Sequence, residues 1–106
     1  MKDKFATFEE FYPFYLKQHS NKICRLLHVV GTTIVLALAI TAVYHNIPEL
    51  WILVPIAGYG FAWVGHFFFE KNKPATFQYP WWSLKSDFKM YFEILSGKRA
   101  LDTSKD

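Results

Sequence analysis

Thiol chemistry is almost missing from this chain of 106 residues, which contains a single cysteine, Cys24. One thiol excludes an internal disulfide and any zinc site built from a cluster of cysteines. Cys24 is most simply read as a small apolar side chain. The chain also lacks a continuous basic stripe and any nucleic-acid-binding motif, so its formal net charge of +3 does not indicate nucleic acid as a partner.

Charge is nearly missing from the middle of the chain. Residues 26–69 contain no Lys or Arg, and their one acid is Glu49. Two apolar runs, Leu26 to Tyr44 and Leu50 to Phe69, lie on either side of it. Each has about the 20 residues that an α-helix needs to cross the core of a bilayer. We therefore expect an all-α membrane protein with a hairpin of two transmembrane helices; a soluble bundle with two buried core helices is the alternative.

The charges of the two flanks predict the orientation of this hairpin. Each flank has more basic than acidic residues, whereas the link His45 to Glu49 has neither Lys nor Arg. The positive-inside rule then places both termini on the cytoplasmic side, where basic flanks attract anionic membrane lipids. Residues 1–25 lack the apolar core and cleavage site of a signal peptide. We expect one membrane-embedded helical domain over residues 1–106, in a bacterial inner membrane or the endoplasmic reticulum.

An amphipathic helix is predicted before the hairpin. Thr7 and Glu10 have the spacing of a capping box, in which the two residues cap each other's backbone N–H groups. Pro13 keeps the helix short or kinks it. Apolar side chains recur at three- and four-residue spacing, at Phe8, Phe11, Tyr12, Tyr15 and Leu16. A short helix with an aromatic face and a charged back is expected to lie in the membrane interface.

The remaining elements follow from caps and breakers. We expect spanning helices from Lys22 to Tyr44, with Ser20-Asn21 supplying the N-cap, and from Leu50 to Lys71. The aromatic loop 74–82 is expected at headgroup depth, as an interface belt. A second interfacial helix should start near Pro80 and end at Gly97. Its apolar stripe is Leu84, Phe88, Tyr91, Phe92 and Leu95.

Polar residues gather at one end of the predicted hairpin. Steps of four along the second helix place Gly58, Ala62, His66 and Glu70 on one face, where a His and a Glu one turn apart can share a metal. His28 lies at the same depth in the first helix, and a loop at Ser20-Asn21 allows His19 to fold back over this end. His45 is excluded because it lies at the opposite end.

Three imidazoles and a carboxylate with open positions suit an Fe(II) that activates O₂, although histidine suits zinc equally. The same residues allow simpler interpretations, in which the histidines bond to backbone or lipid and Glu70 only caps a helix or pairs with a nearby lysine. Two other functions stay open: haem binding through His28 and His66, and a non-catalytic lipid-binding or scaffold role. Small residues at Gly58 and Ala62 would also allow a homo-oligomer.

Several motifs resemble one known family, the small membrane family that includes the fungal 2-hydroxy fatty acid dioxygenase of phytosphingosine degradation. The chain is similar to its short, bacterial-type form over about Phe11 to Phe92. The motifs are Phe11-Tyr12-x-Phe14-Tyr15, His19-x-Asn21, Arg25-x-x-His28-x-x-Gly31-Thr32, Gly65-His66-x-x-x-Glu70-x-Asn72-x-Pro74-Ala75 and Trp82-Ser83-Leu84-x-x-Asp87-Phe88-x-Met90.

This resemblance implies a membrane-bound, Fe(II)-dependent dioxygenase that cleaves a 2-hydroxy fatty acid between C1 and C2 with O₂, giving an acid one carbon shorter. His19, His28 and His66 would be the essential histidines, with Glu70 at the family's acidic position. For the catalytic residues, we expect Arg25 to orient the substrate carboxylate. Asp87 would orient a ligand histidine or be a solvated charge. The acyl tail would lie along the aromatic face in the bilayer.

Overall fold

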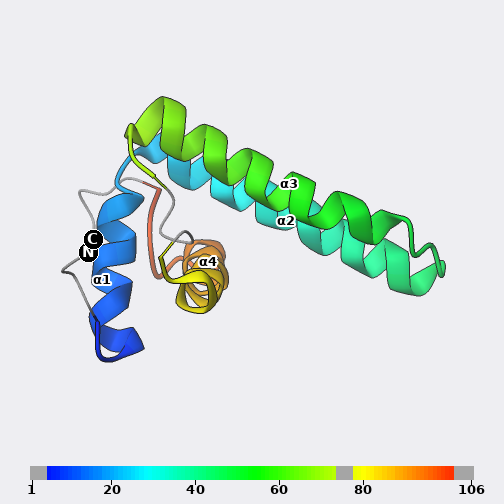
Figure 1. Ribbon diagram of the computed structural model, residues 1–106, viewed down its shortest axis with the longest axis horizontal. Coiled ribbons are helices and arrows are strands. Elements are labelled where there is room, and N and C mark those ends of the chain that lie inside the picture. The colour runs from blue at the N-terminus through cyan, green and yellow to red at the C-terminus, as the bar shows by residue number, and fades with distance from the viewer. Residues whose placement is uncertain (1–4, 74–77, 102–106) are drawn as a thin grey trace.

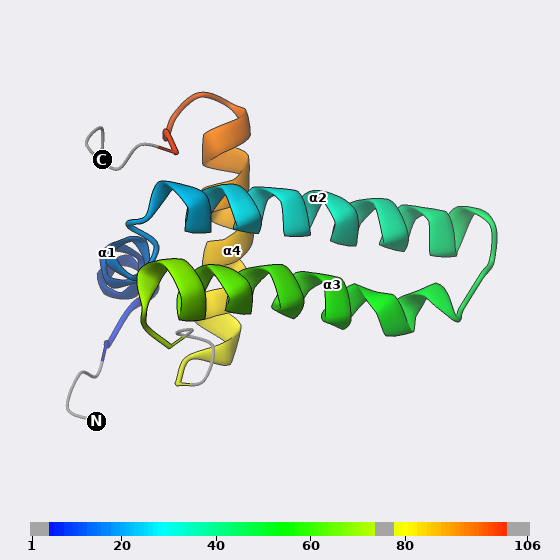
Figure 2. The same cartoon turned by 90° about the horizontal axis from the view of Figure 1, so that it is seen from above.

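The computed structural model describes residues 5–73 and 78–101. These form α1 (Phe8–Gln18), α2 (Lys22–Tyr44), α3 (Leu50–Val64), the π-helix η1 (Gly65–Glu70) and α4 (Pro80–Leu95), with no strand among the described residues. The predicted all-α fold is confirmed. α2 and α3 lie side by side as a long antiparallel hairpin, α1 stands at one end of it, and α4 crosses beneath it near that end (Figures 1 and 2).

The hairpin has the length and surface of a membrane-spanning unit. Lys22–Tyr44 and Leu50–Glu70 are long and apolar enough to cross a membrane, with mean hydropathies of 2.3 and 1.5. Their apolar side chains are largely exposed; Ile40 and Ile52, for example, expose 67% and 66% of their surface. A soluble bundle would bury such side chains in its core. The exposed surface therefore favours the membrane hairpin over the soluble bundle.

The predicted N-caps Thr7 and Asn21 are present, but Glu10 reaches back to the backbone N–H of Ala6 and not to that of Thr7, which the capping box predicted. Thr7 Oγ1 accepts a hydrogen bond of 3.2 Å from the backbone N–H of Glu10, whose carboxylate accepts one of 3.1 Å from Ala6 N–H. Asn21 Oδ1 accepts hydrogen bonds from the backbone N–H groups of Ile23 and Cys24. These bonds satisfy donors that have no partner within a helix. α1, which contains Pro13, has 11 residues and is short, as expected.

The aromatic stripe of α1 packs against α4. Phe11, Tyr12, Tyr15 and Met90 form a buried core between these two helices. The rings of Tyr79 and Trp82, from the start of α4, lie 5.1 and 5.6 Å from that of Phe11. The predicted stripe is therefore buried, and its partner is α4. Residues 74–77, part of the predicted aromatic belt, lie outside the described residues.

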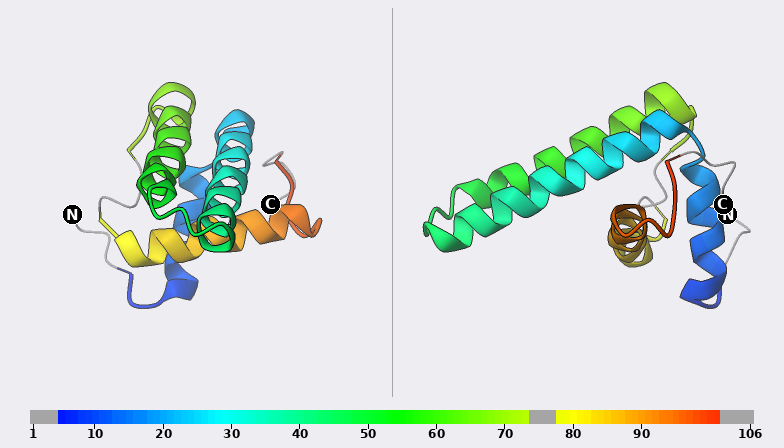
Figure 3. Two further views of the ribbon diagram at one scale, coloured as in Figure 1. Left: turned by 90° about the vertical axis from the view of Figure 1, so that its right-hand side faces the viewer. Right: turned by 180° about the vertical axis from the view of Figure 1, so that it is seen from behind.

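The predicted apolar stripe of α4 is only partly buried. Leu84, Phe92 and Leu95 are exposed, whereas the buried residues of α4 are Ser83, Ser86, Met90 and Tyr91. The helix crosses beneath both helices of the hairpin (Figure 3), so part of its apolar stripe faces the hairpin instead.

Glycines set how closely the two long helices approach. A Cβ atom at Gly31 would lie 2.8 Å from Phe61 Cβ, and one at Gly65 would lie 2.9 Å from Cys24 Sγ. A Cβ at Gly58 would lie 3.3 Å from Val35 Cγ2. The small residue at position 58 therefore faces α2 of the same chain, and a homo-oligomer stays a prediction.

We predict that Gly31→Ala destabilises the protein although alanine is the better helix former. The added methyl overlaps Phe61, and overpacking of this kind costs about 1–3 kcal/mol, more than the roughly 1 kcal/mol of helix propensity gained. Gly60→Ala is the matched control, because a Cβ atom there meets nothing within 4 Å. Unfolding in detergent should show a lower midpoint for Gly31→Ala only; equal midpoints would contradict the close packing at Gly31.

Candidate metal centre

The structure brings three of the four histidines together at the open end of the hairpin, next to α1. His19 follows the end of α1, His28 lies in the second turn of α2, and His66 lies in η1. His19 Nε2 is 3.0 Å from His28 Nε2 and 2.9 Å from His66 Nε2. All three side chains are buried, at 1%, 7% and 1% exposure respectively. The predicted convergence of these residues is thus present.

Each imidazole turns its other nitrogen toward an oxygen acceptor. Nδ1 of His19 is 2.7 Å from the carbonyl oxygen of Tyr15, and Nδ1 of His28 is 2.8 Å from that of Cys24. Nδ1 of His66 is 2.7 Å from Oδ1 of Asn72. An oxygen of this kind only accepts, so each Nδ1 must carry the proton and donate. The three Nε2 atoms are then the unprotonated ones.

Three unprotonated Nε2 atoms therefore point at one another with their lone pairs. Burial, reinforced by the neighbouring His28 and His66, holds the pKa of His19 well below its ordinary value, so protonation does not relieve this repulsion near neutral pH. A cation bound to all three lone pairs would relieve the repulsion. Metal–imidazole bonds of about 2.0–2.1 Å are compatible with nitrogens that lie about 3 Å apart. The donor set thus fits a single metal ion held by three histidines, with positions left open.

The end of the second spanning helix differs from the regular α-helix that the sequence predicts. From Gly65 to Glu70 it is a π-helix, in which hydrogen bonds reach five residues along the chain instead of four. Lys71 then has left-handed backbone angles (φ 62°), and Asn72 N–H donates to the carbonyl of His66 over 2.9 Å. This tight reversal brings the Asn72 side chain back against His66.

Asn72 connects His66 to the end of α1. While Oδ1 accepts from His66, Nδ2 donates to the backbone carbonyl and the side-chain oxygen of Gln18, both at 3.1 Å. Gln18 precedes His19, so one amide holds two of the histidine-bearing segments together. The sequence analysis named Asn72 only as a residue of the family motif and gave it no role in the site. Its place in that motif, directly after a predicted helix end, was the available signal.

Glu70 lies outside the group of metal-binding atoms. Its carboxylate accepts hydrogen bonds from Ser20 Oγ and from the backbone N–H of Asn21. The expectation that Glu70 shares a metal with His66 assumed an α-helix, in which residues four apart share a face. In the π-helical turn that spacing no longer aligns them. Glu70 instead fixes the short turn between α1 and α2, which carries His19.

Cys24 lies at the edge of the same group. His19, Cys24, His28 and His66 each offer one ligand atom, and these four atoms lie within 4.8 Å of one another. The thiol of Cys24 is 3.7 Å from Nδ1 of His28, the nitrogen that faces away from the other imidazoles. The three Nε2 atoms therefore form the convergent set, with the thiol beside it. The sequence indicated only a small apolar residue at position 24.

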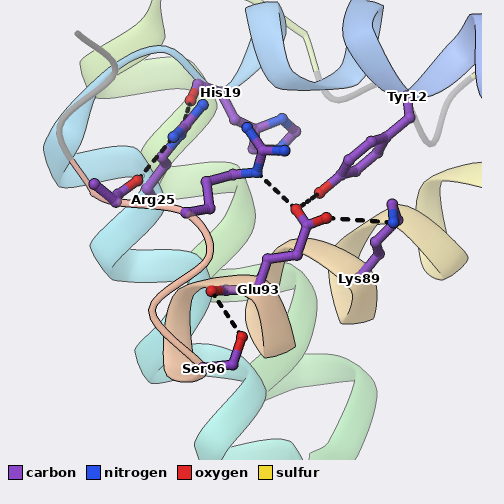
Figure 4. A network of polar contacts seen from close by, with 8 residues as sticks. Tyr12, His19, Arg25, Lys89, Glu93 and Ser96 are labelled. Carbon is purple, nitrogen blue, oxygen red and sulfur yellow. Dashed lines mark hydrogen bonds and ion pairs between the residues drawn. The ribbon is translucent and has the colours of Figure 1, made fainter. Parts of the chain in front are cut away.

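Arg25 is fully buried and bonds to backbone. Its Nε donates to the carbonyl of His19 over 2.6 Å, and Nη1 donates to the carbonyl of Ala100 over 2.9 Å. Figure 4 shows this side chain between the turn that carries His19 and the C-terminal segment. Among the described contacts, Arg25 thus joins the metal-binding turn to the segment after α4, where the sequence analysis expected a contact with a substrate carboxylate.

Glu93 forms a second connection between α1 and the C-terminal segment (Figure 4). Its carboxylate accepts hydrogen bonds from Tyr12 and, at 2.6 Å, from Arg99, and lies 3.3 Å from Lys89 Nζ. Burial alone would raise the pKa of Glu93, but the hydrogen bonds from Tyr12, Arg99 and Lys89 outweigh it and lower the pKa. The ionised carboxylate therefore holds Arg99, and with it the neighbouring Ala100, whose carbonyl accepts the hydrogen bond from Arg25.

Asp87 connects α4 to the metal centre through Tyr15. The Tyr15 hydroxyl donates to the Asp87 carboxylate, and the Tyr15 ring stacks on His19 with ring centroids 3.9 Å apart. Burial raises the pKa of Asp87 to about 7, and the hydrogen bond from Tyr15 opposes part of the rise. Asp87 therefore lies one side chain away from a histidine, in a second shell of contacts. His45, exposed at the far tip of the hairpin, takes no part.

One comparison with known proteins found a match. A family model described as 2-hydroxy-palmitic acid dioxygenase Mpo1-like matches residues 5–99, a range that contains His19, His28 and His66. No curated protein and no solved structure matches the chain.

We predict that Asn72→Leu weakens metal binding about 10–100-fold, the usual cost of losing an outer-shell partner. Without the acceptor, the proton of His66 can move to Nε2 and block the lone pair. Asn72→Asp keeps an oxygen for His66 Nδ1 but, like Asn72→Leu, loses the N–H donor to Gln18, so it should retain more of the affinity than Asn72→Leu. Titration of the metal-free protein with Zn²⁺ or Fe²⁺ measures both. Equal loss in the two variants would contradict the tautomer argument.

We also predict a pH-dependent stability difference between wild type and Asp87→Asn. Between the unfolded pKa of about 3.9 and the folded value of about 7, the folded protein keeps a proton on Asp87 that the unfolded chain has released. The stability of the wild type should therefore fall, relative to the variant, as pH rises from about 4 through about 7. Unfolding in detergent with a chelator present checks this; parallel curves would refute it.

Proposed function

Because the chain belongs to the Mpo1-like family, to which the match over residues 5–99 assigns it, we propose that it is an Fe(II)-dependent dioxygenase of 2-hydroxy fatty acids. One observation carries the proposal: the buried Nε2 atoms of His28 and His66 each lie about 3 Å from Nε2 of His19, and all three are unprotonated because each Nδ1 donates to an oxygen. Three histidines alone also suit zinc or copper. The family description is what favours iron and an oxygenase reaction.

When bound, Fe(II) would supply O₂ activation and, at its open positions, a site for the substrate's carboxylate and 2-hydroxyl oxygens. The overall reaction breaks one C1–C2 bond. A 2-hydroxy acid and one O₂ balance to a fatty acid one carbon shorter, CO₂ and water. All four electrons that reduce O₂ come from the substrate, so the balance requires no external reductant.

The protein side chains hold the ligands in place. Tyr15, Cys24 and Asn72 fix the tautomers of the three histidines through the acceptors that they offer. Arg25 and Glu70 fix the turn that carries His19 from two sides. We assign Arg25 and Asp87 to positioning, because their described bonds go to the backbone and to Tyr15. The proposed site lies at the end of the hairpin that carries both flanks, which the charge pattern places on the cytoplasmic side.

The geometry favours this function over the two alternatives from the sequence. For haem, His28 and His66 would have to face each other across a macrocycle. Their ring centroids are 5.2 Å apart, and the Nε2 of His19 lies about 3 Å from that of each. A non-catalytic lipid-binding role would not require three matched tautomers in a buried site. If the following experiment finds no metal in the folded protein, the result would support the non-catalytic lipid-binding role.

We expect His66→Ala, purified anaerobically in detergent, to lose its bound iron and at least about a hundredfold in kcat/KM on a 2-hydroxy fatty acid. Loss of a direct ligand should exceed the 10–100-fold effect of an outer-shell residue. His45→Ala, at the far tip, is the matched control and should keep both. Iron analysis and product detection under O₂ measure the outcome. Full activity in His66→Ala, or folded wild type without metal, would overturn the proposal.

A further inference from the structure

A cavity of about 230 Å³ lies where α4 crosses the hairpin. Its walls come from α2, α3 and α4, and the residues that matter here are Thr32, Val35, Val54, Gly58, Asp87 and Phe88. Most of this lining is apolar. The cavity is bounded by the two apolar helices on one side and by the exposed apolar stripe of α4 on the other, so an alkyl group can enter it from a bilayer.

The cavity extends away from the metal centre along the hairpin. On α2, Thr32 and Val35 lie four and seven residues beyond His28, or roughly 6 and 10 Å along the helix axis. On the antiparallel α3, Gly58 and Val54 lie eight and twelve residues before His66, or roughly 12 and 18 Å along it. One end is therefore about one helical turn from the three histidines, and the other lies deep in the apolar span.

Polarity changes along this length. Thr32 and Asp87 contribute polar groups to the wall, and both belong to the end nearest the metal centre. Asp87 accepts the hydrogen bond of Tyr15, whose ring stacks on His19. Val35 and Val54, farther along, are purely apolar. A cavity with a polar end at a metal centre and an apolar end in the membrane matches a molecule with a polar head and a long alkyl chain.

We propose that this cavity holds the alkyl chain of the 2-hydroxy fatty acid whose head group lies at the three histidines, and that Gly58 sets how much chain it accepts. The inference rests on the proposed function for the identity of the head group. Gly58 has this role because it lines the cavity at the point where α3 comes closest to Val35: a Cβ atom there would lie 3.3 Å from Val35 Cγ2. A larger side chain at position 58 would be directed away from that tight contact and would reduce the volume of the cavity.

The aromatic side chains are a less suitable place for the tail, although the sequence analysis expected it there. Tyr79 and Trp82 stack on each other and pack against Phe11 in the core between α1 and α4. These rings also line a hollow of about 250 Å³, but none of its lining residues comes from α2 or α3. The cavity beneath the hairpin is instead lined by both of those helices, along which it continues from the end that carries the three histidines.

The test compares Gly58→Leu with Gly60→Leu in the iron-loaded protein under anaerobic conditions, where binding is measured without turnover. The control position is in the same helix and faces open space. The probes are 2-hydroxyhexadecanoate and 2-hydroxyoctanoate, measured by equilibrium dialysis. Gly58→Leu should weaken binding of the long acid about tenfold, the equivalent of roughly two CH₂ groups excluded from the cavity. It should leave binding of the short acid nearly unchanged, and Gly60→Leu should affect neither.

A second measurement does not depend on how well the leucine variant folds. A 2-hydroxyhexadecanoate with a diazirine at the chain end is photolysed on the wild-type protein, and the labelled peptides are mapped. Labelling at Val35, Val54 or Phe88 supports the inference; labelling confined to outward residues such as Ile40 and Ile52 overturns it. A common loss of affinity for both acids in Gly58→Leu would also overturn it.

Failure of this inference is distinguishable from failure of the proposed function. Label in the cavity without product under O₂ would leave the binding site standing and remove the dioxygenase. Product under O₂ with label only on the outer surface would support the dioxygenase and remove the proposed binding site for the alkyl chain. A phospholipid and the unlabelled hydroxy acid can each be added as competitors. If the phospholipid prevents labelling of the cavity as effectively as the hydroxy acid does, the cavity is a site for membrane lipid and the proposal is overturned.

Discussion

The unprotonated Nε2 atoms of His28 and His66 each lie about 3 Å from the unprotonated Nε2 of His19. Their buried lone pairs repel one another, and the rest of the structure holds them in that position. Each Nδ1 is tied to an oxygen that can only accept, so no proton is available to relieve the repulsion. A metal ion bound as we propose would make the same arrangement favourable. Its binding would then be coupled to the folding of this end of the hairpin, as is common where ligands come from separate segments.

The three histidines lie just after α1, in the second turn of α2 and in the π-helix η1, so their relative positions depend on how these segments pack. Two bridging networks keep them in register. Asn72 and Gln18 join the π-helical end of the hairpin to α1, and Arg25 joins the turn after α1 to the segment beyond α4. Because Arg25 is buried, the desolvation of its charge must be offset by hydrogen bonds to well-placed acceptors. This explains why the C-terminal segment belongs to the centre although it contributes no ligand.

The position of the centre also follows from the membrane hairpin. Polar groups that bind a metal are costly within the hydrocarbon core, but at the end of two spanning helices they can be enclosed by flanking helices. α1 covers the histidines from one side, and α4 crosses the hairpin and encloses a cavity against it. A water-excluded polar centre thus lies next to an apolar space, which is the arrangement that an amphipathic substrate requires.

The sequence by itself determined the helices, the caps at Thr7 and Asn21, the hairpin and the convergence of His19, His28 and His66. These follow from local rules: hydrophobic length, side-chain capping, and the equal depth of residues at the start of one helix and the end of its antiparallel neighbour. Only the tertiary structure decided the positions of Glu70, Arg25, Asn72 and Asp87. The π-helical turn and the left-handed backbone of Lys71 set the directions of Glu70 and Asn72. Arg25 is fixed by its contact with the C-terminal segment, and Asp87 by its contact with α1. Which partner a polar side chain meets depends on how separate segments pack, and helical periodicity carries no information about that.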